Sequence, residues 1–292
     1  MKILINGCAG RMGLTLVRLI DADPTLELHG GLEGPTHADM GTDLGVLAGL
    51  PEIGSPVRAD ALELISDADA VIDFSTPAAT LEMAGLCAQA RIVHIIGTTG
   101  FNAEDEAALA AAARHATLVK SGNMSLGVNL LGALVRQAAA ALGDDWDIEI
   151  LDMHHRHKVD APSGTALLLG EEAAKGRDVN LAETRDSGRE GRTRARKAGD
   201  IGFAVLRGGS VVGHHDVAFA GDGESIVLGH RAETRDIFAR GAIKAAQWAH
   251  GRGPGLFSMQ DVWAWATRQS PDWCLGEPIC CLLYTSPSPR DS

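Results

Sequence analysis

A glycine-rich segment near the start of the chain constrains the fold more than any other feature. It reads GCAGRMG over residues 7–13 and follows a short apolar run at residues 2–6. Apolar residues then recur at the spacing of one helix face: Met12, Leu16, Val17, Leu19 and Ile20. This order predicts a strand, a tight turn and a helix whose first N–H groups bind a pyrophosphate. Because the spacing is GxxGxxG and not the commoner GxGxxG, a tight turn without a ligand is the alternative interpretation.

The segments that follow alternate between strand and helix patterns up to about residue 122. Further strands are predicted at residues 26–33, 70–74, 92–96 and 117–120. Helices are predicted at residues 59–65, 78–90 and 103–115. Alternation of this kind is typical of an α/β fold with a doubly wound parallel sheet. We therefore expect residues 1–122 to form a Rossmann-type dinucleotide-binding domain.

The pattern changes from residue 123 onward. Helices are predicted at 126–142 and 164–174, a strand at 147–153, a loop at 177–200, and alternating strands at 201–206, 210–220 and 225–230. Strands that alternate apolar and polar residues indicate a mixed or antiparallel sheet with one face in water. We expect residues 123–230 to form a smaller α+β substrate-binding domain. The last helix, at 234–249, lies in a segment, 231–262, that we expect to return to the first domain.

Three segments at predicted strand ends fit the adenosine ribose and the nicotinamide of a dinucleotide. Glu33 ends the second strand, twenty positions after Gly13, where a carboxylate accepts hydrogen bonds from the hydroxyls of an adenosine ribose. Two further strand ends are rich in small and hydroxyl-bearing residues, GTTGF at 97–101 and SGNMS at 121–125. Such residues let a nicotinamide approach the backbone closely. The alternative for each of these two segments is an ordinary turn with a Ser or Thr helix cap.

The densest ionisable cluster in the chain is HHRHK at residues 154–158, followed by DAPSGT at 160–165. Three interpretations compete. A metal site would use the histidines, but neighbouring side chains in an extended segment point to opposite faces, so we expect no metal. A solvated loop without function is the second. In the third, cationic side chains and the start of a helix at Ser163 bind the carboxylates of an anionic substrate, and a histidine transfers protons.

Charge and hydropathy exclude several classes of function. Lysine and arginine number 26 against 38 aspartates and glutamates, so the net charge is 26 − 38 = −12. Because nucleic-acid affinity is mostly basic charge, we expect no nucleic-acid partner. The basic stretch at 185–197 lacks aromatic residues for base stacking, which favours a mobile surface loop. No long apolar run or secretory signal is present, so we expect no membrane contact and a cytoplasmic location.

The end of the chain differs in composition from the rest. Residues 263–292 contain three of the five tryptophans, the only tyrosine and the run TSPSPRDS. We predict that this segment is a non-native tail that packs poorly. Of the five cysteines, Cys8 and Cys87 lie in apolar patterns that predict small buried thiols.

Taken together, the motifs resemble the 4-hydroxy-tetrahydrodipicolinate reductase family, also called dihydrodipicolinate reductase. The most specific element is HHRHKVDAPSGTA at 154–166. It is supported by GCAGRMG at 7–13, IDFS at 72–75, IGTTGF at 96–101 and NMSLGVN at 123–129. The resemblance covers almost all of residues 1–262. It implies a Rossmann-type domain, a smaller domain for substrate binding and tetramerisation, and NAD(P)H-dependent reduction of a small cyclic dicarboxylate in diaminopimelate and lysine biosynthesis.

The resemblance also implies roles for individual residues. His154 would be the proton donor and acceptor and Lys158 a further proton donor, while His155, Gly164 and Thr165 would bind the substrate. The pyrophosphate would contact Gly7, Cys8, Ala9, Gly10, Arg11 and Met12, and the ribose would contact Glu33. The nicotinamide side would contact Gly97, Thr98, Thr99, Ser121, Gly122, Asn123 and Met124. Gly34 stands where relatives that also use NADPH often have a basic residue, so we expect a preference for NADH.

Two other functions stay open from the sequence. Another Rossmann reductase, such as an amino-acid dehydrogenase, would share the glycine segment and Glu33 but would not need the SGT segment beside the histidines. A protein that binds a nicotinamide cofactor without turnover would need no proton donor. The cluster at 154–165 therefore separates the family's activity from both.

Overall fold

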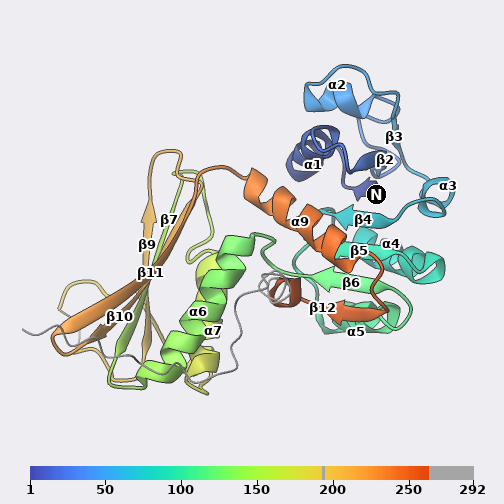
Figure 1. The fold of residues 1–292 in the computed structure, drawn as a ribbon. Helices are drawn as coiled ribbons and strands as arrows, with labels where there is room; N and C mark the ends of the chain where they lie inside the picture. Colours follow the sequence, from blue (N-terminus) through green and yellow to red (C-terminus); the bar gives the residue numbers. More distant parts are fainter. Residues whose placement is uncertain (193–194, 263–292) are drawn as a thin grey trace, which may run out of the picture.

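The computed structural model describes residues 1–192 and 195–262, which form two sheets with helices packed on them (Figure 1). The first sheet has the strand order β12-β6-β5-β4-β1-β2-β3, and every pair in it is parallel. Its strands are β1 (Lys2–Asn6), β2 (Glu27–Leu32), β3 (Val57–Arg58), β4 (Ala70–Asp73), β5 (Val93–Ile96), β6 (Thr117–Lys120) and β12 (Gly255–Phe257). The parallel, doubly wound sheet expected from the alternating pattern is confirmed.

Helices cover both faces of this sheet because its strands are apolar on both sides. They are α1 (Arg11–Asp21), α2 (Leu44–Ala48), α3 (Leu62–Ile65), α4 (Pro77–Ala90), α5 (Ala103–Ala112) and α9 (Asp236–Ala249). Successive strand residues point to opposite faces. Ile3 and Ile5 accordingly belong to the cluster with α1 and α9, whereas Leu4 belongs to the cluster with α4 and α5.

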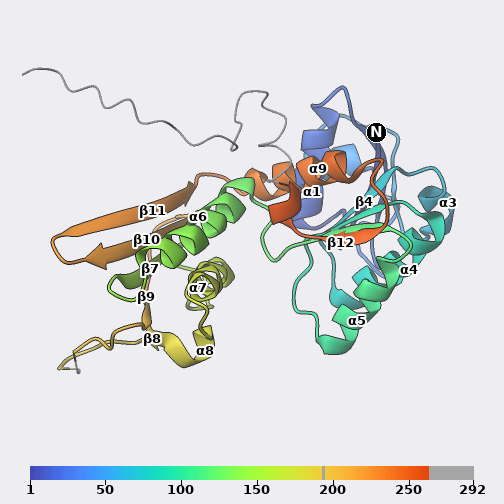
Figure 2. The same cartoon turned by 60° about the horizontal axis from the view of Figure 1, so that its bottom comes forward.

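The second sheet is mixed, with the order β11-β10-β7-β9-β8. Its strands are β7 (Asp147–His154), β8 (Arg185–Ser187), β9 (Ile201–Arg207), β10 (Gly213–Gly221) and β11 (Glu224–Ala232). Pairs β7–β9 and β8–β9 are parallel, and β10 runs antiparallel to both β7 and β11. Helices α6 (Leu126–Leu142) and α7 (Gly164–Gly176) pack on one face, as Figure 2 shows. The predicted mixed sheet is confirmed.

The chain crosses between the two sheets twice. It leaves the first sheet after β6, at residues 121–125, and builds the second sheet and its helices. After β11 it returns through α9, which packs against α1, β4 and β5, and through β12, which pairs with β6 (Figure 1). Gly241 of α9 lies so close to the carbonyl oxygen of Met124 that a Cβ there would collide with it. The two crossings therefore touch each other beside residues 121–125.

The predicted loop at 177–200 is wrong in part. It contains the short helix α8 (Leu181–Thr184), which begins after the capping side chain of Asn180, and the strand β8, which adds to β9. The helix predicted at 59–65 begins only at Leu62, because the Asp60 carboxylate accepts the Leu62 N–H in a preceding turn. Helix α2 and strands β3 and β12 are too short for the periodicity to predict.

Other predictions concern burial and the chain end. Cys8 and Cys87 are buried free thiols, as predicted. The segment 263–292 lies outside the described residues, so the predicted tail stays a prediction. In the part of the chain that the structure describes, no helix is both long and apolar enough to cross a membrane.

Candidate active site

The glycine segment forms a tight loop between β1 and α1. Gly7 has a φ of 81°, and a Cβ there would lie 2.7 Å from the carbonyl oxygen of Phe74. At Gly13 a Cβ would collide with the carbonyl oxygens of Gly7 and Cys8. Gly10 caps α1 without any side-chain hydrogen bond, so the first N–H groups of the helix have no internal acceptor. These are the features that a pyrophosphate needs at a helix N-terminus, and the loop fits the phosphates of a dinucleotide.

Glu33 lies beside this loop at the end of β2. Its Oε1 accepts the Ala9 N–H at 2.9 Å, which ties the loop to the strand. Glu33 also lines a hollow of about 680 Å³ together with Asp60 and Glu82. The Cys8 side chain is buried, and this burial, with the charge of Glu33 second, raises the pKa of its thiol to about 12. The hollow fits the adenosine end of the cofactor.

The segments predicted to face the nicotinamide lie at the ends of β5 and β6. Gly97, Gly122 and Met124 line a cleft between the two sheets, and Thr99 is exposed. Thr98 is buried, and its hydroxyl bonds Asp73 Oδ1 at 3.2 Å. The Thr98 side chain therefore shapes the loop from inside, and a cofactor contact by its backbone stays a prediction.

The cleft has a volume of about 350 Å³ and joins the two halves of the chain. Cofactor-side residues that line it are Met12, Gly97, Gly122, Asn123 and Met124. From the second sheet and its loops come His154, His155, Lys158, Gly164 and Thr165, which are all the residues predicted for catalysis and substrate binding. Ser163, where the sequence predicted the start of the carboxylate-binding helix, lines it too, and the remaining lining residues, which the sequence did not single out for the site, are Phe74, Val212, Arg235 and Phe238.

Asn123 connects the two sides of the cleft directly. Its Nδ2 donates to Thr165 Oγ1 at 3.0 Å, and its Oδ1 accepts the Ser125 N–H at 2.9 Å. Asn123 is buried. A residue predicted to contact the cofactor thus also positions the helix that was predicted to bind the substrate.

Helix α7 begins at the floor of the cleft. Ser163 caps it by accepting the Ala166 N–H at 3.1 Å, and this leaves the N–H groups of Gly164 and Thr165 without helical acceptors. The positive end of a 13-residue helix dipole therefore faces the cleft. His155 and Arg235, whose Nε2 and Nη2 atoms are 3.4 Å apart, lie at its rim. Together these groups make a receptor for carboxylates.

His154 ends β7 and is 8% exposed. Its Nδ1 lies 2.7 Å from Oδ1 of Asp152, a carboxylate with no exposed surface. The approach is a close electrostatic contact and not a well-aligned hydrogen bond, because neither atom meets hydrogen-bond geometry. Since Nδ1 is buried against this carboxylate, Nε2 is the ring nitrogen available to the cleft.

The surroundings of His154 favour its neutral form. Its pKa is lowered from 6.5 to about 4, chiefly by burial and also by His215, Lys158 and Arg207, against the opposing pull of the Asp152 carboxylate. A dianionic ligand in the cleft would add negative charge and raise this pKa.

Lys158 lies in the turn that follows β7. Its Nζ lies 2.7 Å from Asp160 Oδ1, and this hydrogen bond lowers the pKa of the Asp160 carboxyl. The turn is fixed to the β9–β10 connection because the Arg156 N–H donates to the Gly209 carbonyl oxygen at 3.2 Å. The Lys158 ammonium is thus held at the cleft wall, close to His154.

Asp152, His154 and His215 have donor atoms within 4.8 Å of one another, a spacing that a metal ion could span. However, Arg207 Nη2 already lies 3.3 Å from Asp152 Oδ2, and the Ser163 N–H donates to the same oxygen at 2.7 Å. A guanidinium in this position supplies the positive charge that the carboxylate needs. The predicted absence of a metal stays a prediction.

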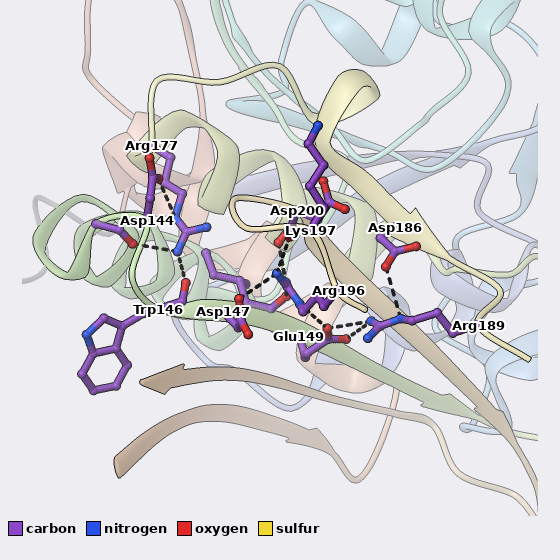
Figure 3. Close-up of polar contacts among 12 residues, drawn as sticks. Asp144, Trp146, Asp147, Glu149, Arg177, Asp186, Arg189, Arg196, Lys197 and Asp200 are labelled. Atoms are coloured by element: carbon purple, nitrogen blue, oxygen red, sulfur yellow. Dashed lines mark hydrogen bonds and ion pairs between the residues drawn. The ribbon is translucent and has the colours of Figure 1, made fainter. Parts of the chain in front are cut away.

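The basic stretch at 185–197 does not reach the cleft in its described part. Figure 3 shows Arg189 and Arg196 directed at β7, where both pair with Glu149, at 2.5 and 3.0 Å. Arg196 also pairs with Asp147 at 2.8 Å. These arginines hold the segment on the second sheet, so their charges are not free for a substrate.

Comparison with known proteins decides the family. One family model, described as the N-terminus of dihydrodipicolinate reductase, matches residues 1–124, and another, its C-terminus, matches residues 127–263. The chain belongs to the dihydrodipicolinate reductase family. The resemblance inferred from the motifs is confirmed, and the protein is an NAD(P)H-dependent reductase.

Named relatives agree. The chain is 68% identical over 263 residues to 4-hydroxy-tetrahydrodipicolinate reductase of Parvibaculum lavamentivorans, covering 90% of this reductase and 97% of that protein. It is 60% identical to 4-hydroxy-tetrahydrodipicolinate reductase 1 of Mesorhizobium japonicum, covering 90% and 96%. Among solved structures, dipicolinate-bound dihydrodipicolinate reductase from Paenisporosarcina sp. TG-14 has the same fold, with a TM-score of 0.73, 24% identity, and coverage of 89% and 98%.

The pKa of His154 can be tested directly. In the free reductase we expect the His154 ring to titrate near pH 4 by NMR, assigned by its loss in His154→Gln, because burial disfavours the charged ring. Since the folded pKa lies below the unfolded value, His154 stabilises the fold fully above about pH 6.5 and less as the pH falls toward 4. A midpoint at 6.5 or above would contradict this description of the site.

Proposed function

We propose that this reductase converts 4-hydroxy-tetrahydrodipicolinate into tetrahydrodipicolinate, in diaminopimelate and lysine biosynthesis. The observation that carries the proposal is the cleft in which the cofactor-side loops meet His154, Lys158 and the N-terminus of α7. The names of the relatives support the same reaction.

The substrate is a small cyclic dicarboxylate with two negative groups to bind. One carboxylate fits the N–H groups of Gly164 and Thr165, and the Asn123–Thr165 bond keeps this helix start next to the cofactor loops. The other fits the rim at His155 and Arg235. The relative from Paenisporosarcina has dipicolinate bound, a planar molecule with the same pair of carboxylates.

The reaction adds one hydride and one proton to the substrate and releases water. When bound, the nicotinamide cofactor supplies the hydride. His154 gains a proton on Nε2 as the substrate's charge enters the cleft and transfers it to the ring. Lys158, held at the cleft wall by Asp160, supports the negative charge that develops. The proton that Lys158 gives goes to the departing hydroxyl, and the proton that the ring loses as water forms balances it.

Variants of the cluster test these roles. We expect His154→Gln and Lys158→Ala to lower kcat by about 10²-fold or more, the usual scale for acid–base groups, while NADH binding measured by fluorescence is retained. His155→Ala should instead raise KM more than it lowers kcat, because it removes a carboxylate contact and leaves the proton donor in place.

Matched controls are the exposed His115→Gln and Lys244→Ala, which lie away from the cleft and should leave both constants unchanged. Steady-state oxidation of NADH with enzymatically generated 4-hydroxy-tetrahydrodipicolinate gives all of these values. Wild-type turnover in both His154→Gln and Lys158→Ala would overturn the assignment.

For the cofactor, we propose a preference for NADH over NADPH. The hollow beside β2 is lined by three carboxylates, Glu33, Asp60 and Glu82, and the residues that line it include no lysine or arginine. A 2′-phosphate placed there would meet negative charge at short range. Gly34 offers no side chain to offset it, and its Cβ position is open space.

The proposed preference for NADH over NADPH can be measured by comparing catalytic efficiencies. We expect kcat/KM to be higher with NADH, and Gly34→Arg to raise kcat/KM for NADPH, because a guanidinium pairs with the phosphate. Gly253→Arg, which also points into open space but lies just before β12, at the edge of the sheet opposite β3, is the control for added charge. A wild-type preference for NADPH would show that another cation, such as Arg58 on β3, reaches the phosphate.

We also propose that the reductase is a homotetramer that assembles through the second sheet. In the described part of the chain, no helix covers the face of that sheet opposite α6 and α7 (Figure 2). The register places on this face Leu151, Met153, Ala204, Leu206, Ala218 and Val227. Leu151, Met153, Ala204 and Leu206 adjoin one another on β7 and β9 as an apolar strip, whereas Glu149 and Asp216 lie between this strip and Val227. Leu206 is 47% and Val227 59% exposed, and exposed apolar strips are typical of protein interfaces. The cytoplasmic location stays a prediction.

Light scattering tests this assembly. We expect about four chains per particle for the wild type and fewer for Leu206→Glu, because a carboxylate in the apolar strip would be buried without a partner. Leu256→Glu is a matched control, since Leu256 is 46% exposed on the edge strand β12 of the other sheet. A monomeric wild type, or an unchanged mass for Leu206→Glu, would refute the proposed interface.

A further inference from the structure

We propose that Asp152 is a positioning residue for this reaction: it holds His154 with Nδ1 against its carboxylate and Nε2 toward the cleft, and the same carboxylate anchors the start of the substrate helix α7. The inference rests on the proposed role of His154 as the proton-transferring group. Asp152 belongs to β7, two residues before His154, and strand alternation places both side chains on the face that α7 covers.

The two oxygens of the carboxylate serve different elements. Oδ1 lies 2.7 Å from His154 Nδ1, whereas Oδ2 accepts the Ser163 N–H at 2.7 Å. Ser163 is the residue that caps α7 and is followed by the exposed N–H groups of Gly164 and Thr165. One buried side chain thus sets the distance between the proton donor and the carboxylate receptor.

The carboxylate is built to stay ionised. Burial alone would raise the pKa of Asp152, but the close contact with His215 and the hydrogen bond from the Ser163 N–H hold it well below its usual range. Arg207 lies 3.3 Å away and is itself fixed, because its Nη2 donates to the Asp160 carbonyl oxygen at 2.6 Å. Burying a charge costs free energy even when the charge is paired. A buried carboxylate with this many partners therefore indicates a role in orienting a neighbouring group.

His215 completes the support from β10. Its Nε2 lies 3.1 Å from Ser163 Oγ and 3.4 Å from Asp152 Oδ1. Its ring packs edge-on against the ring of His154, with centroids 5.1 Å apart and planes at 71°. The ring of His154 is therefore held on one side by the carboxylate and on another by His215, so its freedom to rotate is small.

This arrangement fixes the tautomer of the neutral ring. A carboxylate beside Nδ1 favours a proton on Nδ1, and Nε2 then carries the lone pair. The proton gained on substrate binding must go to Nε2, on the cleft side, and from there it can reach the substrate. Without the carboxylate the ring could place its proton on either nitrogen, and a fraction of molecules would present no acceptor to the cleft.

The first test uses the wild-type reductase. We expect ¹⁵N NMR at pH 7 to find His154 as the neutral Nδ1–H tautomer. An Nε2–H tautomer would overturn the proposal. This measurement needs no variant to fold.

The second test is Asp152→Asn, which keeps the shape and an acceptor for the Ser163 N–H but removes the charge. We expect kcat to fall by about 10- to 100-fold, the scale of loss when a group that orients a functional histidine is removed. KM should change little, because the α7 receptor is retained. The His154 pKa should move further down, since the opposite charge that raises it is gone. Asp178→Asn, the same change at an exposed position of the same domain, should have no effect.

A double variant separates this proposal from the proposed function. If Asp152 acts through His154, Asp152→Asn should cost no further kcat in the His154→Gln background. An undiminished loss in that background, or an unshifted His154 pKa in Asp152→Asn, would reduce Asp152 to a structural residue and overturn the inference. Full turnover of His154→Gln alone would instead overturn the assignment of His154, whatever Asp152 does.

Discussion

The buried Asp152 carboxylate connects the fold to the chemistry through its contacts with His154 and with the Ser163 N–H. The carboxylate lies in the interior of the second sheet, with one oxygen against His154 and the other against the first turn of α7. A buried charge cannot be left without partners, so β7, β9, β10 and α7 must all be in place before it is stabilised. The proposed proton donor and the proposed substrate receptor therefore form together, as one packed unit.

The two crossings of the chain between the sheets bring the cofactor-side loops next to Asp152, His154 and α7. Residues 121–125 leave the first sheet and cap α6, and α9 returns across the same place, with Gly241 against the Met124 backbone. Asn123 bonds Thr165 from the crossing itself. Ligands of open α/β sheets bind beyond the carboxyl ends of the strands, and here those ends face the second domain. In the proposed reaction, the hydride donor and the dicarboxylate would meet in the cleft that both receptors and His154 line.

The sequence predicted the elements and ligand-binding segments that depend on local pattern. The glycine segment, Glu33 and the cluster at 154–165 could be found because their residues are adjacent or lie at fixed strand ends. Asp152, His215 and Arg235 were missed, because their roles come from strand pairing and from the return of α9, which join residues far apart in the chain. For Asp152 a signal existed, since position i−2 on a strand shares a face with His154. Thr98 was assigned to the cofactor by its segment, yet its hydroxyl points inward to Asp73.

The central claim is that an anionic substrate charges His154 in the cleft between the sheets. Calorimetric titration with dipicolinate in the presence of NADH, at pH 6 in buffers of different ionisation enthalpy, counts the protons taken up. With a free-state pKa of about 4, His154 is almost entirely neutral at pH 6, so its protonation in the complex corresponds to uptake of roughly one proton per site. We expect that uptake in the wild type and its loss in His154→Gln. Binding without proton uptake, or uptake that persists in His154→Gln, would contradict the account.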